Sequence, residues 1–222
     1  MIVVRSMHEG WLSNAYVVGD EPGGTCVFVD SGAPLEPLFE AVEGKRLTPT
    51  HLLTTHGHAD HTAGDDEILA RYDLARSTGA VETGGLAIEA LPTPGHADDH
   101  VAFLVNREAV VCGDILARDS VGGGADVATI RHSVMDVLMK LPPETRVLPG
   151  HSVETTIGRE WEENPFVLYW RGEAPSIDDD VRVAGADAML VVWGPDYDGK
   201  GKALVRFADG REAIVGGSRV ER

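Results

Sequence analysis

Short apolar runs separated by turns mark the first third of the chain. Runs rich in β-branched and aromatic residues predict strands at residues 2–5, 15–18 and 25–29, and a shorter apolar run predicts one at 51–54. Four apolar residues recur at the spacing of one helix face: Leu35, Leu38, Phe39 and Val42. This spacing predicts an amphipathic helix over residues 34–42, opened by Pro34.

The same alternation continues to residue 150. Apolar runs predict strands at 86–91, 101–105, 109–112 and 147–148. A short helix with Ile68, Leu69 and Tyr72 on its inner face should precede them. A second amphipathic helix should carry Ile130 and Leu141 near its ends and stop at Pro142-Pro143. Strands and helices in alternation predict an α/β architecture, with sheets covered by helices.

The last fifty residues follow a different pattern. Residues 171–180 combine glycine, proline and an acidic run, which is typical of a linker. Beyond it, four β-like runs at 181–183, 189–193, 203–207 and 212–215 include no helical stretch, and Asp209-Gly210 is a strong hairpin signal. We therefore predict two domains, a main one over residues 1–172 and a small barrel-like, β-rich appendage over 178–222.

Composition narrows the classes of partner and compartment. The chain has 19 basic and 36 acidic residues among 222, for a formal charge of −17, which repels nucleic acid and anionic membranes. Its only cysteines, Cys26 and Cys112, lie in apolar runs and are expected to be small buried hydrophobes. Neither a signal peptide nor a run of about 18 apolar residues is found. These features predict a cytoplasmic protein that acts on a small molecule.

Three histidines and an aspartate stand together after the strand predicted at 51–54. The segment reads His56-Gly57-His58-Ala59-Asp60-His61. Neutral imidazole and carboxylate are the ligands that zinc, iron and manganese accept. Alternate residues of an extended loop point the same way, so His56 and His58 could share one ion, whereas Asp60 and His61 would address a second.

Three further ligand-type residues follow predicted strands at similar places. His96 comes after Thr93-Pro94-Gly95, Asp114 after Cys112-Gly113, and His151 after Pro149-Gly150. In each case an apolar strand delivers the residue onto a loop where a glycine leaves room for the backbone, which is the usual placement of functional residues. With the first cluster they make seven candidate ligands, enough for two metal ions.

These motifs, in this order, resemble the metallo-β-lactamase fold superfamily over about residues 1–170. The resemblance rests on the segment 55–64 together with Thr93-Pro94-Gly95-His96, Gly113-Asp114 and Pro149-Gly150-His151. It implies a four-layer αβ/βα sandwich with the metals at one edge. It also implies a ligand set for each ion: His56, His58 and His96 for one, Asp60, His61 and His151 for the other, with Asp114 bridging them. Because an aspartate stands at the bridging position, the chain resembles the hydroxyacylglutathione hydrolase-like branch of the superfamily.

The implied activity is that of a metal-dependent hydrolase. Two divalent metal ions, zinc first and iron or manganese as alternatives, would hold a bridging hydroxide that attacks a small thioester or related ester. Asp60 would both bind metal and align the nucleophile through a hydrogen bond. One alternative is a mononuclear Fe(II) persulfide dioxygenase of the glutathione persulfide type that uses His56, His96 and Asp114. Another is a lactonase or phosphodiesterase of the same fold.

The remaining polar residues and the appendage have no assigned chemistry. We expect His100 to be a surface residue or a neighbour of the ligands, and His8, His51 and His132 to be structural. Arg118 is expected to be an exposed loop residue, with contact to an anionic substrate as the alternative. For the appendage the sequence leaves open dimerisation into a homodimer or shielding of the site.

Overall fold

The computed structural model describes residues 1–74 and 76–222. The backbone forms two compact units, each assembled from several stretches of chain. The first contains Met1–Pro92, Asp99–Gly113 and Gly150–Ser152, and the second contains Thr93–Asp98, Asp114–Pro149 and Val153–Arg222.

The first unit is built around a five-stranded sheet. Its strands, in spatial order, are β1 (Ile2–Met7), β2 (Asn14–Gly19), β3 (Thr25–Val29), β4 (Thr48–Leu53) and β5 (Arg76–Ser77). The first three pair antiparallel, whereas β3, β4 and β5 run parallel. The four strands predicted in this region are confirmed, and the two-residue β5 is too short for a pattern of alternation to reveal.

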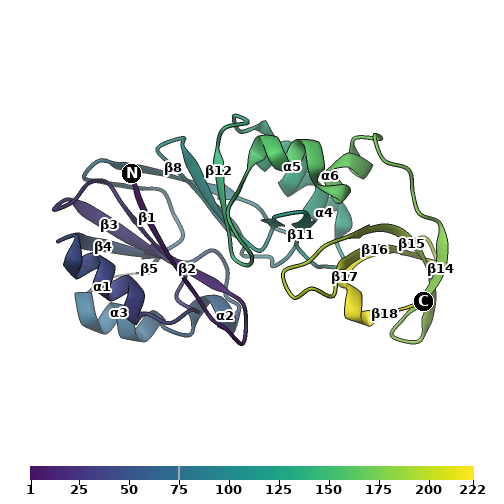
Figure 1. Cartoon of the computed structure of the whole chain (residues 1–222), viewed down its shortest axis with the longest axis horizontal. Coiled ribbons are helices and arrows are strands. Elements are labelled where there is room, and N and C mark those ends of the chain that lie inside the picture. Colours follow the sequence, from purple (N-terminus) through teal and green to yellow (C-terminus); the bar gives the residue numbers. More distant parts are fainter. Residues whose placement is uncertain (75) are drawn as a thin grey trace. The chain divides into compact units, whose positions relative to one another are not determined.

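Two helices cover one face of this sheet, α1 (Glu36–Gly44) and α3 (Asp65–Tyr72) (Figure 1). The predicted apolar stripe of α1 is confirmed, because Leu38, Phe39 and Val42 are buried in one core with residues of β2, β3 and β4. The predicted opening at Pro34 is wrong. The helix begins at Glu36 with Leu35 as its N-cap, and the proline of its first turn is Pro37.

A second set of strands completes the first unit. β6 (Val81–Thr83), β7 (Leu86–Pro92), β8 (Val101–Val105) and β9 (Ala109–Gly113) are successive antiparallel neighbours. Every residue of β9 is buried, which explains its uninterrupted apolar run. Cys112 on β9 and Cys26 on β3 are buried cysteines, as predicted, and burial raises the pKa of the Cys26 thiol to about 12.

The second unit contains short strands and helices besides its C-terminal sheet, and among them only the strand at 147–148 and one helix were predicted. β10 (Leu116–Ala117) pairs with β11 (Ser120–Val121), and β12 (Arg146–Pro149) pairs with β13 (Thr155–Thr156). The helix expected to run through Ile130 to Leu141 is three segments, α4 (Val127–His132), a π-helical turn (Ser133–Val137) and a 3-10 turn (Leu138–Lys140). Helices α5 (Ile157–Glu163) and α6 (Pro165–Trp170) follow β13.

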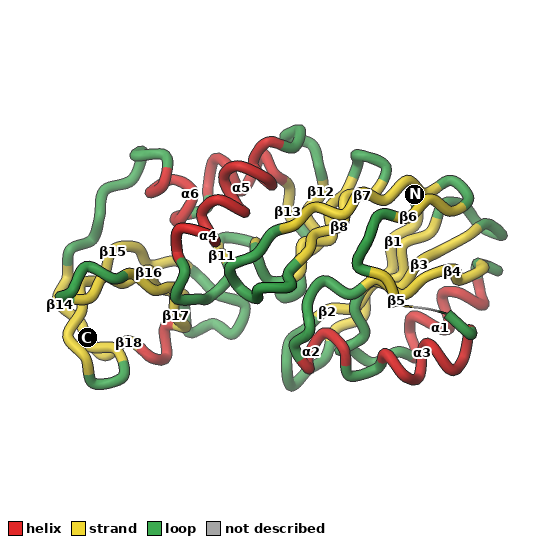
Figure 2. Tube along the Cα trace, turned by 180° about the vertical axis from the view of Figure 1, so that it is seen from behind, coloured by secondary structure: helices red, strands yellow, loops and turns green. Residues whose placement is uncertain are grey.

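The β-rich C-terminal appendage is confirmed. Its five antiparallel strands are, in spatial order, β17 (Glu212–Gly216), β16 (Lys202–Phe207), β15 (Ala186–Gly194), β14 (Asp179–Val183) and β18 (Val220–Glu221). A 3-10 turn (Gly217–Arg219) leads to β18, and the sheet curls so that β18 lies beside β14 (Figure 2). The sheet has its own core around Val181, Leu190 and Val205. The domain limits 1–172 and 178–222 stay a prediction.

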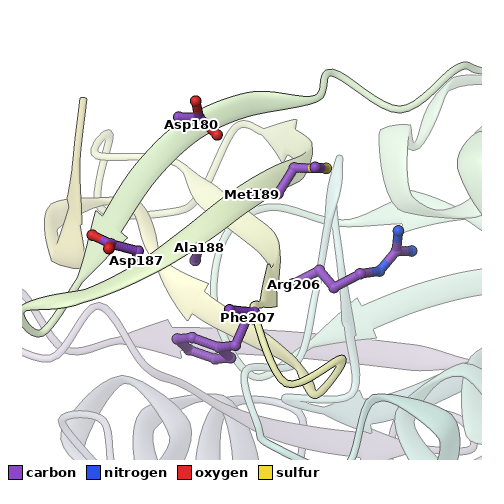
Figure 3. A pocket seen from close by; sticks show the side chains of 7 residues that line it. Asp180, Asp187, Ala188, Met189, Arg206 and Phe207 are labelled. Atoms are coloured by element: carbon purple, nitrogen blue, oxygen red, sulfur yellow. The ribbon is translucent and has the colours of Figure 1, made fainter.

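A shallow hollow of about 350 Å³ lies on the C-terminal sheet (Figure 3). It is lined by seven residues, which belong to β14, β15, β16 and the turn after β16 and include Asp180, Asp187 and Arg206. Their charged groups point in different directions, and the Arg206 guanidinium is held 2.8 Å from Glu212 Oε1. Ligand pockets need polar groups that converge, so we assign no ligand to this hollow.

A buried polar network joins α5 and α6 to the β10–β11 hairpin. Glu160 is fully buried and its carboxylate accepts hydrogen bonds from Asp119 N at 2.9 Å, Thr155 Oγ1 at 2.6 Å and Arg159 Nη1 at 2.7 Å. Asn164 donates to the same carboxylate at 2.9 Å and to the Ser120 carbonyl oxygen at 3.1 Å. The carboxylate of Glu160 therefore fixes the turn between β10 and β11.

Replacing Glu160 by alanine should destabilise the fold. Several buried donors would lose their acceptor, at a cost of about 2–3 kcal/mol in the free energy of unfolding. Urea denaturation of the full chain measures this cost. Glu162→Ala, at an exposed position of the same helix, is the control and should change stability by less than about 0.5 kcal/mol. Equal effects at the two positions would contradict the role of Glu160.

Among the described residues, no helix has the length and hydropathy that crossing a bilayer requires.

Candidate metal centre

The end of β4 places four of the predicted ligands on one short segment. After Leu53 the chain runs through His56 and His58, and α2 (Ala59–Thr62) begins directly afterwards with His58 as its N-cap. Asp60 and His61 therefore lie on one turn of helix, while His56 and His58 precede it on extended backbone. The backbone therefore changes from extended to helical between the two pairs.

The structure brings Asp60, His61 and His151 together in the first unit. Asp60 Oδ2 lies 3.3 Å from His151 Nε2 and 3.8 Å from His61 Nε2. His61 is fully buried and His151 is 4% exposed, whereas the Asp60 side chain is 29% exposed. The three ligand atoms face one another closely enough to hold a single cation.

His61 is oriented from behind by a buried carboxylate. Asp30 Oδ2 lies 2.8 Å from His61 Nδ1, and Asp30 also accepts hydrogen bonds from Thr55 N and Thr55 Oγ1, each at 2.8 Å. Because the Asp30 carboxylate accepts a hydrogen bond from the Nδ1–H group of His61, the lone pair of His61 is on Nε2 and points toward Asp60 and His151. Such a carboxylate behind a histidine is typical of metal ligands.

His56 and His58 form a second pair in the same unit. His56 Nε2 lies 3.0 Å from His58 Nδ1, and His56 Nδ1 lies 3.1 Å from Thr55 Oγ1. The Thr55 hydroxyl donates a hydrogen bond to Asp30, so its oxygen accepts one from the Nδ1–H group of His56. The lone pair of His56 is consequently on Nε2, beside His58.

His151 is held in the same way by a backbone carbonyl. Its Nδ1 lies 3.0 Å from the carbonyl oxygen of Leu12, which can only accept a hydrogen bond. Leu12 adopts a left-handed conformation with φ 59°, and the next residue, Ser13, forms a β-bridge with His151. The loop before β2 thus fixes both the position and the tautomer of His151.

His96 and Asp114 form a pair in the second unit. His96 Nε2 lies 3.5 Å from Asp114 Oδ2, and His96 Nδ1 lies 3.1 Å from the carbonyl oxygen of Gly123. The backbone carbonyl accepts a hydrogen bond from the Nδ1–H group of His96, so the lone pair is on Nε2 and faces the carboxylate. Both side chains are partly buried, at 17% and 13% exposure.

The donor chemistry of these groups fits divalent metal ions. Ligand atoms about 2.0–2.2 Å from a tetrahedral metal lie roughly 3.3–3.5 Å apart. The measured separations within the units range from 3.0 Å for His56–His58 to 3.8 Å for Asp60–His61. Four of the five histidines also have an acceptor behind Nδ1, so that Nε2 is available for metal.

Three other predictions about histidines can be compared with the structure. His100 is 1% exposed and its ring stacks 5.0 Å from that of His56, so the surface assignment is wrong and the assignment as a neighbour of the ligands is correct. His132 is exposed, with Nδ1 3.1 Å from Asp136, as expected of a structural residue. His8 accepts hydrogen bonds from the backbone of Gly10 and Trp11, which is also a structural role.

Sequence reasoning missed Asp30. The residue follows the apolar strand β3 and precedes Ser31-Gly32, which is the same strand-end pattern that identified Asp114. It has φ 57°, a conformation that aspartate tolerates better than most residues. The strand-end position was therefore present, but the glycine follows Asp30 at position 32, whereas Gly113 directly precedes Asp114.

Gly32 offers a direct test of the geometry around Asp60. A Cβ at this position would lie 1.6 Å from the carbonyl oxygen of Asp60, so Gly32→Ala should displace the first turn of α2. We expect a loss of about 2–3 kcal/mol in stability and weaker metal binding, measured by urea denaturation and metal titration. The matched control is Gly44→Ala, because no atom lies within 4 Å of a Cβ there. Normal metal binding by Gly32→Ala would refute the packing argument.

Comparison with known proteins shows several relatives. The family model described as the metallo-beta-lactamase superfamily matches residues 8–83. An uncharacterized protein of Aquifex aeolicus (strain VF5) is 30% identical over 193 residues, which span 69% of this chain and 90% of that protein. The hydroxyacylglutathione hydrolase of Acidiphilium cryptum (strain JF-5) is 32% identical over 148 residues, which span 58% of this chain and 60% of that enzyme.

Solved structures are similar in fold. The crystal structure of ETHE1 from Myxococcus xanthus matches with a TM-score of 0.66 and 28% identity, over 76% of this chain and 85% of that one. The crystal structure of TTHA1623 in a di-iron-bound form matches with a TM-score of 0.61 and 30% identity, over 73% of this chain and 100% of that one. These likenesses confirm the predicted α/β class and sandwich fold, and they support the use of divalent metal.

Proposed function

Because this chain belongs to the metallo-beta-lactamase superfamily, we propose that it is a metal-dependent hydrolase of small thioesters or related esters. The observation that carries the proposal is the cluster of Asp60, His61 and His151. Its ligand atoms face one another, while Asp30 and the Leu12 carbonyl fix the tautomers of the two histidines from behind. Side chains held in this way are ready to bind a cation without rearrangement.

We propose that all seven predicted ligands contribute and that two ions bind, zinc first, with iron or manganese as alternatives. In this assignment His56, His58 and His96 would hold one ion, Asp60, His61 and His151 would hold the other, and Asp114 would contribute to both. When bound, such ions supply Lewis acidity that lowers the pKa of water from about 15.7 to near 7. Structure TTHA1623, in its di-iron-bound form, supports a pair of ions in this fold.

The side chains divide the work of hydrolysis between binding and positioning. Asp60 is the most exposed member of its cluster at 29%, so substrate and water can reach its carboxylate. It would accept a hydrogen bond from the attacking water and so align the lone pair toward the carbonyl carbon. Water adds to this carbon, the bond from carbon to sulfur breaks, and the products are a carboxylic acid and a thiol.

A small molecule is the substrate class that the charge of the chain favours. A net charge of −17 disfavours nucleic acid, which argues against a phosphodiesterase acting on RNA or DNA. The relative from Acidiphilium cryptum carries the name hydroxyacylglutathione hydrolase, which supports a thioester over a lactone.

A second candidate is persulfide oxidation by a single Fe(II). The donor set favours it, because His96 Nε2 lies 3.5 Å from Asp114 Oδ2 and, with His56, these residues would supply two imidazoles and one carboxylate. The two activities differ in their cosubstrate, because the dioxygenase consumes oxygen and the hydrolase does not.

An activity panel separates these candidates. The purified chain is tested on thioesters, lactones, phosphodiesters and glutathione persulfide, with oxygen uptake recorded in each assay. We expect release of thiol from a thioester without oxygen uptake, and loss of that activity after chelation. Oxygen consumption on the persulfide with no thioester hydrolysis would overturn the proposal in favour of the dioxygenase.

A further inference from the structure

A run of three glycines, residues 122–124, lies between the second unit's ligand pair and the C-terminal sheet. Gly123 provides the carbonyl oxygen that accepts the Nδ1 proton of His96, at 3.1 Å. Gly122 packs so closely that a Cβ there would lie 3.1 Å from His96 Cβ and 2.7 Å from the carbonyl oxygen of Asp114. This glycine run therefore touches both members of the pair.

The glycine run is itself paired with the edge strand of the C-terminal sheet. Gly124 N donates to the Ile214 carbonyl oxygen at 2.9 Å, and Ile214 N donates to the Gly124 carbonyl oxygen at 2.8 Å. Ile214 belongs to β17, which ends the spatial order of the sheet, and its side chain is 2% exposed. The sheet thus extends by one backbone bridge to the residue next to Gly123.

Two further contacts join the C-terminal sheet to the hairpin that follows Asp114. Ser120 Oγ lies 3.4 Å from Asp196 Oδ1, in the loop after β15. A Cβ on Gly194, the last residue of β15, would lie 3.0 Å from the carbonyl oxygen of Asp119. Residues 119–124 are therefore in contact with the sheet at both of their ends.

We propose that the C-terminal sheet positions His96 and Asp114, and is thus part of the metal site's supporting structure. The pairing of Ile214 with Gly124 holds the Gly123 carbonyl in place, and this carbonyl fixes His96 with its lone pair on Nε2. The inference rests on the proposed function for the role of the two residues as metal ligands. It gives the appendage a role other than dimerisation or shielding.

The substitution Ile214→Pro tests the backbone bridge in the full chain. In an antiparallel pair, a residue directs both its N–H and its carbonyl to the same neighbouring strand. Ile214 directs both to Gly124, so a proline at 214 removes the hydrogen bond from Ile214 N to the Gly124 carbonyl oxygen without removing one between β16 and β17. The ring would also push the Gly124 carbonyl away and displace Gly123 with it.

Two control variants separate the bridge from general effects. Ile214→Ala removes the buried side chain and keeps the N–H. Gly216→Pro places a proline two residues further along β17, where the backbone N–H also points away from β16. The backbone there, with φ −60° and ψ 139°, suits proline, and the nearest atom to a Cβ among the described residues is 3.9 Å away. If the appendage acts only through general stability, Ile214→Ala should resemble Ile214→Pro.

The first measurement uses the metal-free protein and needs no activity. Long-range proton–nitrogen NMR at a pH where imidazole is neutral reports which ring nitrogen of His96 carries the proton. Wild type and both controls should show the proton on Nδ1, whereas Ile214→Pro should show both tautomers. An unchanged His96 tautomer in Ile214→Pro would overturn the inference.

The second measurement is a Zn²⁺ titration in competition with a chelator. Loss of a group behind a histidine ligand weakens metal binding by about 10–100-fold, so one Zn²⁺ should bind at least about 10-fold more weakly to Ile214→Pro than to either control. Equal affinities in all variants would contradict the inference. If wild type binds no Zn²⁺ while the tautomer still shifts in Ile214→Pro, the metal assignment fails and the positioning of His96 stands.

Discussion

Replacing Asp114 by alanine is expected to abolish hydrolysis and remove at least one bound metal ion. Asp114 Oδ2 lies 3.5 Å from His96 Nε2, and we assign this carboxylate to both ions. Loss of a group behind a ligand costs about 10–100-fold in metal affinity, so loss of the ligand itself should cost more. Metal content after dialysis and the rate of thioester hydrolysis measure the effect.

His132→Ala is the matched control for this substitution. His132 is 66% exposed in α4 of the same unit, with its ring nitrogen 3.1 Å from Asp136 one helical turn later. An exposed pair of this kind contributes less than about 1 kcal/mol, so activity and metal content should stay at the wild-type level. Equal losses in the two variants would break the assignment of Asp114 as a ligand.

Replacing Asp30 by alanine is expected to weaken both the fold and the metal site. The carboxylate is 1% exposed and accepts from Thr55 N, Thr55 Oγ1 and His61 Nδ1, each at 2.8 Å. Without it these buried donors lose their acceptor, which should cost about 3–5 kcal/mol in the free energy of unfolding. His61 also loses its fixed tautomer, so the affinity for one ion should fall by about 10–100-fold.

The control for Asp30 is an aspartate of the same unit that faces solvent. Asp66 is fully exposed and lies 3.5 Å from Arg76 Nη2, so Asp66→Ala should change stability by less than about 1 kcal/mol. Urea denaturation and Zn²⁺ titration are performed on both variants. Wild-type Zn²⁺ affinity in Asp30→Ala would show that the carboxylate has no part in orienting His61.

Periodicity was sufficient to predict the longer elements of the fold. The stripe of Leu38, Phe39 and Val42 buries itself as expected, and the apolar runs of β3, β8 and β9 are buried strands. The start of α1 was misplaced because proline is compatible with both a loop and a first helical turn. The two-residue strands β5, β10 and β11 depend on pairing partners distant in sequence, which no local pattern contains.

The candidate ligands could be predicted from spacing, but the groups that orient them could not. His56, His58, Asp60 and His61 stand within six residues, so their chemistry is visible in one segment. Three of the four acceptors behind Nδ1 come from distant parts of the chain, namely the backbone carbonyls of Leu12 and Gly123 and the carboxylate of Asp30. A backbone carbonyl leaves no signal in a sequence, because every residue has one.

The appendage illustrates the same limit. Four of its five strands and the Asp209-Gly210 turn were evident from the sequence, whereas β18 was not, and the turn does join β16 to β17. The bridge from Ile214 to Gly124 was not, because an edge strand can pair with any nearby backbone. The role of the appendage could therefore be connected with the metal ligands only after the structure placed Ile214 beside Gly124.

Metal counting on the purified chain, combined with thioester hydrolysis on the same sample, tests the central claim most directly. The sample is analysed for zinc, iron and manganese, stripped with a chelator, and assayed again after each metal is restored. We predict two metal ions per chain, no thiol release from the stripped protein, and recovery when metal returns. Full hydrolysis by the stripped protein, or one iron per chain with oxygen consumed on a persulfide, would contradict the claim.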